Sequence, residues 1–368
     1  ASEGLNLTAA VGGYPLCCPF RGSLLSGRYP QHCVPGHEYR MPPDTPTIAT
    51  ALRDHGYHTA YFGKWHVDGF KERNGRAAFH IVPPERRGGF DEWVGYENNN
   101  AQWDCWVHGG RGEDAFHTRL PGYETDALSD MLIDYIEARG RDLAAGQGKP
   151  FFAALSVQPP HDPYVAPAEW MARHTPAGVE LRANVPDVAP VLHRCRRELA
   201  GYYAMIENLD WNVGRIRDAL EAAGLIDNTH ILFFSDHGDM HGSHGQFRKT
   251  SPWEESVRIP FIMGGASRSR YGHGGGERAV PINHVDIAPT TLGLCGIDAP
   301  EAMQGTDYSG LWRRDREVAD APDSAYIQSV IPTGHGDSID RAWRGVVTTD
   351  GWKYVALEHQ PWLLFNLD

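Results

Sequence analysis

The stretch THILFFSDHGD, residues 229–239, decides the fold of this chain. Its apolar centre has the length and composition of a buried β-strand, and a polar Ser-Asp-His-Gly sequence follows directly. Two other stretches have the same form, YHTAYFGKWH at 57–66 and KPFFAALSVQPPHDP at 149–163. The sequence therefore predicts three core strands that each end in polar or charged side chains.

The side chains at these strand ends are of types that bind ions and transfer protons. They are Lys64, His66, His161, Asp236 and His237. In open α/β sheets, the ligand crevice lies at the carboxyl ends of the strands. We therefore expect these residues, which are far apart in the sequence, to converge on one site.

Helical segments alternate with the predicted strands. Residues 45–56 begin with a threonine cap candidate and end at a glycine, and residues 125–140 carry apolar residues at helical spacing before a glycine. A long amphipathic helix is predicted over 197–224, where apolar residues recur every three or four positions. The apolar run RIPFIMGG, residues 258–265, is typical of a strand. This alternation predicts an α/β fold in which helices sandwich a mixed sheet.

The C-terminal region has a different pattern. In VVTTDGWKYVAL, residues 346–357, alternating residues flank Asp350-Gly351, which predicts a hairpin at the start of a small antiparallel subdomain. We expect one α/β domain over 1–315 and a partial C-terminal subdomain over 316–368. Residues 67–124 have weak periodicity and are predicted to be insertions over one face, where binding loops usually lie.

Composition limits the classes of function. Of the 368 residues, 41% are hydrophobic and 22% are charged, and no apolar run approaches the roughly 20 residues that span a bilayer. We therefore expect no membrane span. The net charge of −13 argues against a nucleic-acid partner, which would require a basic surface. A small anionic substrate is compatible with this charge if basic residues gather in one cleft.

Asp236 and His237 are candidates for a metal pair. The glycines of GDMHGSHG, residues 238–245, allow a close approach of the backbone to a ligand, which favours this interpretation over two ordinary polar side chains. A zinc cluster of His237, His241 and His244 is the alternative. It is less favoured, because the same glycines interrupt a regular helix.

Lys64 and His66 combine an anion-binding group with an acid–base group. His161 lies in a proline-rich loop, and Lys249 lies in the polar stretch FRKTSPWEE. Taken alone, these two residues would be interpreted as a loop histidine and a solvated charge. Their function depends on whether the predicted strand ends converge.

The stretch LCCPFRGSLLSGRYP, residues 16–30, contains two adjacent cysteines and an unusual spacing. Cys17 by itself is compatible with a buried thiol or with a thiolate nucleophile. Its spacing resembles the sulfatase signature Cys-x-Pro-x-Arg, in which a maturation enzyme oxidises the first cysteine to the aldehyde formylglycine. Cys17 matches this signature through Pro19 and Arg21, whereas Cys18 has phenylalanine and glycine at the corresponding positions.

The resemblance to the sulfatase family extends over nearly the whole chain. TIATALRDHGYHTAYFGKWH at 47–66, PFFAALSVQPPHDPY at 150–164 and LFFSDHGDMHGSHGQFRK at 232–249 resemble further motifs of the family, in the family's order. The resemblance implies an alkaline-phosphatase-like mixed sheet sandwiched by helices. It also implies a sulfuric ester hydrolase whose catalytic domain covers residues 1–315.

The resemblance further implies a mechanism. Hydrated formylglycine at position 17 is a geminal diol, and one of its hydroxyls, polarised by a divalent metal, attacks the sulfur of a sulfate ester. The alcohol leaves, protonated by His161 or assisted by Lys249. The second hydroxyl, deprotonated by His66, expels sulfate and restores the aldehyde.

The remaining basic groups have implied roles in binding charge. Lys64, Lys249 and His161 would hold the sulfate oxygens and stabilise the charge that develops in the transition state. Arg21 would support the diol and the metal. Such a local cluster of positive groups suits a small anionic substrate in an otherwise acidic protein.

The implied metal ligands are Asp236, His237 and the modified Cys17. Calcium is the favoured metal, and manganese or magnesium are the alternatives. Many sulfatases carry asparagine at the position of His237, and the imidazole ligand in its place leaves manganese open. Family members normally begin with a strand that ends in paired aspartates, which supply two more ligands. The resemblance therefore implies a chain truncated at both ends, without this first core strand.

Two other functions stay open. Phosphonate and phosphate monoester hydrolases of the same superfamily share the Cys-x-Pro-x-Arg motif, and a non-catalytic anion-binding protein is the alternative if the truncated form is natural. The expected substrate is a sulfate ester of a carbohydrate or another small molecule. Candidate contacts to it are Trp103, Trp106, His108 and Asn98–Asn100, although the aromatic residues could equally pack the loop.

The family resemblance also implies a partner and a location. The expected partner is a formylglycine-generating enzyme or an anaerobic sulfatase-maturating enzyme. A periplasmic or secreted location is favoured on the same ground.

Overall fold

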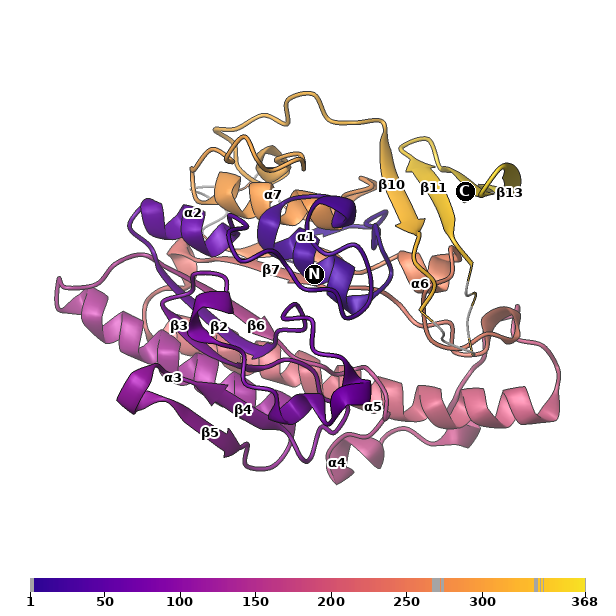
Figure 1. Cartoon of the computed structure of the whole chain (residues 1–368), viewed down its shortest axis with the longest axis horizontal. Helices are drawn as coiled ribbons and strands as arrows, with labels where there is room; N and C mark the ends of the chain where they lie inside the picture. Colours follow the sequence, from indigo (N-terminus) through magenta and orange to yellow (C-terminus); the bar gives the residue numbers. More distant parts are fainter. Residues whose placement is uncertain are drawn as a thin grey trace. The chain divides into compact units, whose positions relative to one another are not determined.

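The computed structural model describes residues 3–266, 272, 275–333, 337, 339 and 341–367. The chain divides into two compact units, whose segments alternate along the sequence (Figure 1). Unit 1 consists of Ala1–Ala51, Ile226–Met240 and Gln246–Asp368. Unit 2 consists of Leu52–Leu225 and His241–Gly245.

The first sheet of unit 1 has the strand order β7-β8-β1-β9. Its strands are β1 (Leu5–Leu7), β7 (His230–Phe234), β8 (Phe261–Gly265) and β9 (Gly276–Arg278). β8 runs antiparallel to both β1 and β7, while β1 and β9 are parallel. The strands predicted within 229–239 and 258–265 are therefore confirmed, and they are neighbours.

In the described part of unit 1, four α-helices lie wholly or partly within its segments. They are α1 (Cys17–Ser26), α2 (Ile48–Asp54), α6 (Glu254–Val257) and α7 (Ile287–Leu294). Phe20 of α1 and Ile287 and Leu294 of α7 share one buried cluster with Leu5 and Phe261 of the sheet. This cluster fixes α1, and with it the cysteine motif, against the sheet that contains β7.

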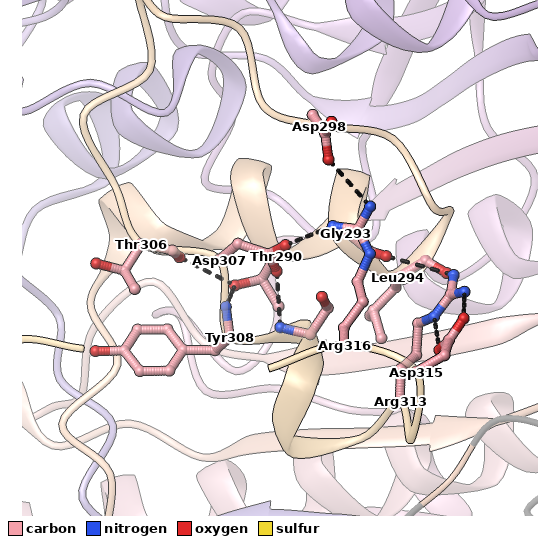
Figure 2. A network of polar contacts seen from close by, with 11 residues as sticks. Thr290, Gly293, Leu294, Asp298, Thr306, Asp307, Tyr308, Arg313, Asp315 and Arg316 are labelled. Carbon is pink, nitrogen blue, oxygen red and sulfur yellow. Dashed lines mark hydrogen bonds and ion pairs between the residues drawn. The ribbon is translucent and has the colours of Figure 1, made fainter. Parts of the chain in front are cut away.

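A polar network surrounds the C-terminal end of α7 (Figure 2). The Arg313 guanidinium donates to the backbone carbonyl of Leu294 at 2.8 Å and pairs with the Asp315 carboxylate. Arg316 bridges Asp307 and Asp298 at 3.0 and 3.2 Å. Arg313 thus satisfies a carbonyl group that the helix end leaves without a helical partner, whereas Arg316 pairs with carboxylates.

The second sheet of unit 1 is antiparallel, with the order β10-β11-β12-β13. Its strands are β10 (Ser324–Ser329), β11 (Trp343–Thr348), β12 (Trp352–Leu357) and β13 (Gln360–Asn366). The hairpin predicted at Asp350-Gly351 is confirmed, and Gly351 supplies the positive φ of 81° that its turn needs. The boundary between residues 315 and 316 stays a prediction.

Unit 2 is built on a five-stranded sheet of order β5-β4-β3-β2-β6. Its strands are β2 (His58–Lys64), β3 (Glu92–Tyr96), β4 (Trp106–Gly109), β5 (Phe116–Arg119) and β6 (Phe151–Ser156). β2 lies between β3 and β6 and is parallel to both. Since β2 and β6 are parallel neighbours, the loops that follow them leave the same edge of the sheet.

Three α-helices complete unit 2. They are α3 (Glu124–Ala144), α4 (Ala168–Met171) and α5 (Ala189–Ala222). The long helices α3 and α5 lie side by side, and α3 also packs against β2 and β6 (Figure 1). None of the helices in the described part of the chain combines the length and the apolar character needed to cross a membrane.

Three expectations from the sequence need correction. Residues 67–124 are not insertions alone, because they contain β3, which pairs with β2 in the centre of the sheet, and also β4 and β5. The long helix begins at Ala189 rather than 197, since Pro190 is tolerated in the first turn, where its missing N–H leaves no bond unmade. The three predicted strand ends do not share one sheet, because β7 belongs to unit 1 and β2 and β6 to unit 2.

Candidate functional site

The cysteine motif forms the first turns of α1. Cys17 is the first residue of the helix and Arg21 lies one turn further, so both side chains project from the same side. The helix ends at Gly27, which adopts a left-handed φ of 62° and donates its N–H to the Ser23 carbonyl. Both Cys17 and Arg21 are buried, and the positive end of the helix dipole lies at Cys17.

Asp236 and His237 follow the last residues of β7. The Asp236 carboxylate accepts a hydrogen bond from the His237 backbone N–H at 3.0 Å, and its other oxygen lies 3.5 Å from His237 Nε2. His237 Nδ1 lies 2.8 Å from the Gly238 carbonyl, which can only accept a hydrogen bond. Nδ1 therefore carries the proton, and Nε2 is left as a lone-pair donor for a metal.

Cys17, Asp236 and His237 come together in unit 1. Cys17 Sγ lies 3.4 Å from His237 Nε2, and one ligand atom from each of the three residues lies within 4.8 Å of the others. A carboxylate oxygen, an imidazole nitrogen and the Cys17 side chain can therefore all contact a single cation. This donor set fits the divalent metal that the family resemblance implies.

Electrostatics at His237 agree with a cation site. Burial lowers the pKa of His237, and the Lys249 ammonium acts in the same direction. The Asp236 carboxylate and the Cys17 thiol more than offset both effects, so the net pKa lies above the usual value of histidine. The position of His237 Nε2 is therefore one where positive charge is favoured.

Lys249 is buried in a loop of unit 1 with unusual backbone angles. Its neighbours Arg248 and Thr250 have φ of 69° and 73°, which is costly for a β-branched residue such as Thr250. The Thr250 carbonyl accepts a hydrogen bond from Trp343 Nε1 at 2.9 Å, which helps to hold this conformation. Strained backbone of this kind clusters at functional sites.

Two residues next to Asp236 were missed by sequence reasoning. A Cβ on Gly12 would lie 3.0 Å from the Asp236 carbonyl oxygen and 3.2 Å from His284 Nε2. His284 is buried, and burial together with the charge of His237 lowers its pKa to about 3, which keeps it neutral. The only local signal for this packing is the paired glycine in AVGGYP.

Lys64 and His66 lie at the carboxyl end of β2 in unit 2, and both are buried. The Lys64 carbonyl accepts hydrogen bonds from Ser156 Oγ, at 3.0 Å, and from the Tyr61 hydroxyl. His66 has a left-handed φ of 55°, which turns the chain sharply after the strand. These contacts fix the backbone that presents both side chains.

His161 lies in the loop after β6, the parallel neighbour of β2. Its Nδ1 donates to the Asp162 carbonyl at 2.9 Å, and its own carbonyl accepts from Gln102 Nε2 at 3.0 Å. Lys64, His66 and His161 therefore follow two strands that end at the same edge of one sheet. That they act together with Cys17, Asp236, His237 and Lys249 stays a prediction.

Among the candidate substrate contacts, His108 is unsuitable. Its side chain is fully buried, Nε2 accepts a hydrogen bond from the Val82 N–H at 2.8 Å, and burial lowers its pKa to about 3. Trp106 is partly buried and donates to Asp104, whereas Trp103 is 45% exposed.

Comparisons with known protein families match nearly the whole chain. The family model for sulfatases matches residues 1–297, and the model for the C-terminal part of N-sulphoglucosamine sulphohydrolase matches residues 242–367. The chain belongs to the sulfatase family. In this family, a formylglycine and a divalent metal are general features.

Individual relatives agree with this assignment. An ulvan-active sulfatase from Formosa agariphila is 33% identical over 357 residues, which cover 91% of this chain and 63% of the relative. The chain thus spans less than two thirds of that sulfatase's length. A Bacteroides fragilis protein classed as the sulfatase YidJ has a structure with a TM-score of 0.82 at 27% identity, covering 100% of this chain and 82% of its own.

The fold extends beyond enzymes that are named sulfatases. A phosphonate monoester hydrolase from Silicibacter pomeroyi has a TM-score of 0.74 at 21% identity, covering 99% of this chain and 82% of its own, which shows a common fold. The predicted alkaline-phosphatase-like α/β fold with an antiparallel C-terminal sheet is confirmed.

Proposed function

We propose that this chain hydrolyses sulfate esters of carbohydrates, with Cys17 converted to formylglycine as the nucleophile. The observation that carries the proposal is the contact between Cys17 and the pair Asp236–His237, at the start of a helix with the sequence Cys-x-Pro-x-Arg. A nucleophile next to a metal-ligand pair is the arrangement that ester hydrolysis with a metal requires.

Within unit 1, the helix start and Arg21 stabilise negative charge. The positive end of the α1 dipole and the Arg21 guanidinium favour the ionised form of the side chain at position 17, and they attract the sulfate group that this side chain attacks. An aldehyde at this position supplies a hydrate with two hydroxyls, of which one can attack and the other can later drive the release of sulfate.

Asp236, His237 and the modified Cys17 are the proposed metal ligands. When bound, a divalent metal polarises the nucleophile and the sulfate oxygens. Calcium is the proposed ion, because the site combines a carboxylate with the oxygens of the modified side chain. The imidazole of His237 makes manganese or another transition metal an alternative, and magnesium, which takes oxygen ligands as calcium does, is a further one.

The basic residues at the strand ends have separate proposed roles. Lys64 and Lys249 hold the sulfate oxygens through charge-assisted hydrogen bonds. As the bond between sulfur and the ester oxygen breaks, His161 or Lys249 gives a proton to the leaving alcohol. His66 then removes the proton of the second hydroxyl, sulfate leaves, and water hydrates the aldehyde again.

The relatives suggest the substrate class and the setting. The name of the ulvan-active sulfatase supports a sulfated polysaccharide as substrate. Relatives also include an extracellular sulfatase homologue from Drosophila melanogaster, which supports a periplasmic or secreted location. The proposed partner is a formylglycine-generating enzyme or an anaerobic sulfatase-maturating enzyme. We also propose a catalytic domain over 1–315 and a C-terminal subdomain over 316–368.

Phosphonate or phosphate monoester hydrolysis is the second candidate, because a phosphonate monoester hydrolase shares the fold. Rates with matched aryl sulfate and aryl phosphonate esters separate the two candidates. A protein that binds inorganic sulfate but hydrolyses neither ester would be the non-catalytic anion binder.

The test uses the chain produced together with a maturation enzyme. Mass spectrometry of the peptide that holds residues 16–28 measures conversion of Cys17, and release of sulfate from an aryl sulfate and from ulvan measures activity. We expect Cys17→Ala to abolish turnover with little change in melting temperature. Cys18→Ala is the matched control, since this buried cysteine lacks the motif, and it should keep both the modification and activity. Full activity with an unmodified thiol at position 17 would contradict the proposal.

A further inference from the structure

A cavity of 320 Å³ lies in unit 2, and part of its lining is Asn98–Asn100, which are candidate substrate contacts. It is lined by Glu72, Gly75, Arg76, Ala77, Ala78 and Asn98–Ala101. Its lining comes from two segments, the turn at 72–78 and the loop that follows β3. Its volume is at the lower end of the range of about 300–1,000 Å³ that is typical of small-molecule sites.

Asn98 is the polar group that most needs a ligand here. Its side chain is 5% exposed, and its Nδ2 donates to the Glu72 carboxylate. Among the described residues, Asn98 Oδ1 has no hydrogen-bond partner, although it is buried. A buried acceptor without a partner is unfavourable, so a ligand that offers a hydroxyl donor would stabilise this arrangement.

The surrounding side chains are already held in place. Asn99 Nδ2 donates to the Ala101 carbonyl at 3.1 Å. The Arg76 guanidinium pairs with the Asp104 carboxylate at 2.7 Å and lies over the Phe79 ring at 4.8 Å. The cavity is therefore preformed, which lowers the cost of ordering side chains when a ligand binds.

The charges of the lining favour a neutral ligand. Asp104 already balances Arg76, and Glu72 adds a negative charge that repels sulfate and other anions. The amides and the carboxylate accept hydrogen bonds from hydroxyl groups. Further along the same loop, the exposed Trp103 ring packs against Tyr123 at 5.2 Å and offers a flat apolar surface of the kind that sugar rings contact.

We propose that this cavity binds an unsulfated glycosyl unit of the carbohydrate substrate, with hydroxyls donating to Asn98 Oδ1 and to Glu72. The inference rests on the proposed function and adds residues that determine specificity. It assigns recognition of the sugar to the segments 72–78 and 98–101, independently of the groups that act on the sulfate ester.

The experiment compares two substrates in the fully matured protein. Asn98→Ala and Glu72→Gln are assayed with an oligosaccharide prepared from ulvan and with nitrophenyl sulfate, which has no sugar. We expect kcat/KM for the oligosaccharide to fall about tenfold, mainly through KM, because a hydroxyl of the bound sugar loses its hydrogen-bond acceptor in the protein. We expect kcat/KM for nitrophenyl sulfate to stay unchanged. Glu113→Gln, an exposed carboxylate in unit 2, is the matched control and should alter neither value.

A second measurement does not depend on turnover. Binding of the desulfated ulvan oligosaccharide to the Cys17→Ala protein is followed by calorimetry, with and without Asn98→Ala. Saturable binding that Asn98→Ala weakens supports the cavity as a sugar site, even if the wild-type protein hydrolyses neither sulfate and the proposed function fails. An active wild-type enzyme with no such binding overturns the inference, as does an equal loss of both activities in the variants.

Discussion

Glu97 is a buried carboxylate whose ionisation should affect stability. It lies just after β3 and accepts hydrogen bonds from the backbone N–H groups of Asp68 and Phe70. Burial raises the pKa of Glu97 to about 7, with a further contribution from the Asp68 carboxylate, although the N–H donors act in the opposite direction. The protonated form is therefore favoured in the folded protein more than in the unfolded chain.

We predict that the contribution of Glu97 to stability declines as the pH rises from about 4.5 to about 7, while the buried His108, His230 and His284, whose pKa values are lowered, act in the opposite direction. In this window, the folded protein binds more protons at Glu97 than the unfolded chain does, so the free energy of unfolding falls by on the order of 3 kcal/mol for this group. Asp286 should contribute in the same direction, because burial also raises its pKa to about 7. Urea denaturation at several pH values measures the combined pH dependence.

The variant Glu97→Gln tests the assignment of this decline. It removes this contribution, so the free energy of unfolding of the variant relative to the wild type should increase by on the order of 3 kcal/mol between about pH 4.5 and about pH 7, whatever the variant does to overall stability. Glu113→Gln, whose side chain is exposed, should leave the pH dependence unchanged. A pH dependence in Glu97→Gln that equals that of the wild type would assign the effect to other groups.

The residues of the candidate site differ in how far the sequence reveals them. Cys17 and Arg21 are found because their motif is local, and Asp236 and His237 are found because they end a strongly apolar strand. Gly12 and His284 are missed, because their importance depends on contacts with Asp236, which is distant in the sequence. His108 is proposed wrongly, since nothing local shows that the pairing of β3 and β4 leads to complete burial.

At the level of elements, α7 depends on side chains for its C-terminal end. Arg313 donates to the carbonyl of Leu294 at 2.8 Å, as Figure 2 shows, and is oriented by Asp315 through two hydrogen bonds. Since a charged donor also favours the negative end of the helix dipole, Arg313→Ala should lower the free energy of unfolding by about 1–2 kcal/mol. Thermal denaturation measures this loss.

Arg314→Ala is the matched control for this prediction. Arg314 is exposed and next in sequence, and its loss should change the free energy of unfolding by less than about 0.5 kcal/mol. Equal melting temperatures for Arg313→Ala and the wild type would show that water replaces the arginine at the helix end without cost.

Elements with a continuous apolar run or with one apolar face can be predicted from the sequence, and elements with neither cannot. The strands within 57–66 and 229–239 have continuous apolar runs, and α3 and α5 have one apolar face. α1 has no such face, because almost all of its residues are buried. β3 is a short strand in a stretch rich in glycine and asparagine, so it is recognised only through its pairing with β2.

At the level of the whole molecule, neither compact unit is one continuous segment of the sequence. Unit 1 combines three segments, and the five residues His241–Gly245 belong to unit 2 although both flanking segments belong to unit 1. The predicted division at residue 315 follows the order of the sequence, whereas the compact units are defined by contacts between distant segments, which local sequence patterns do not reveal. Prediction from sequence therefore reaches the fold class but not this division into units.

The division into units leads to a prediction about metal binding and turnover. All three proposed metal ligands belong to unit 1, whereas Lys64 belongs to unit 2 and is proposed to hold the sulfate. Lys64→Ala should therefore reduce kcat by about 100-fold, as expected for the loss of one group that stabilises transition-state charge, and should leave calcium affinity unchanged. Asp236→Ala should lower calcium affinity by more than about tenfold and abolish turnover.

Calorimetric titration with calcium and sulfate release from nitrophenyl sulfate, both on fully matured protein, measure the two effects. Lys71→Ala removes an exposed lysine of unit 2 and is the matched control for charge, with wild-type values expected in both measurements. If Lys64→Ala weakened calcium binding as much as Asp236→Ala, Lys64 would support the metal site rather than the sulfate. If it instead turned over substrate at the wild-type rate with normal calcium affinity, Lys64 would have no part in the reaction.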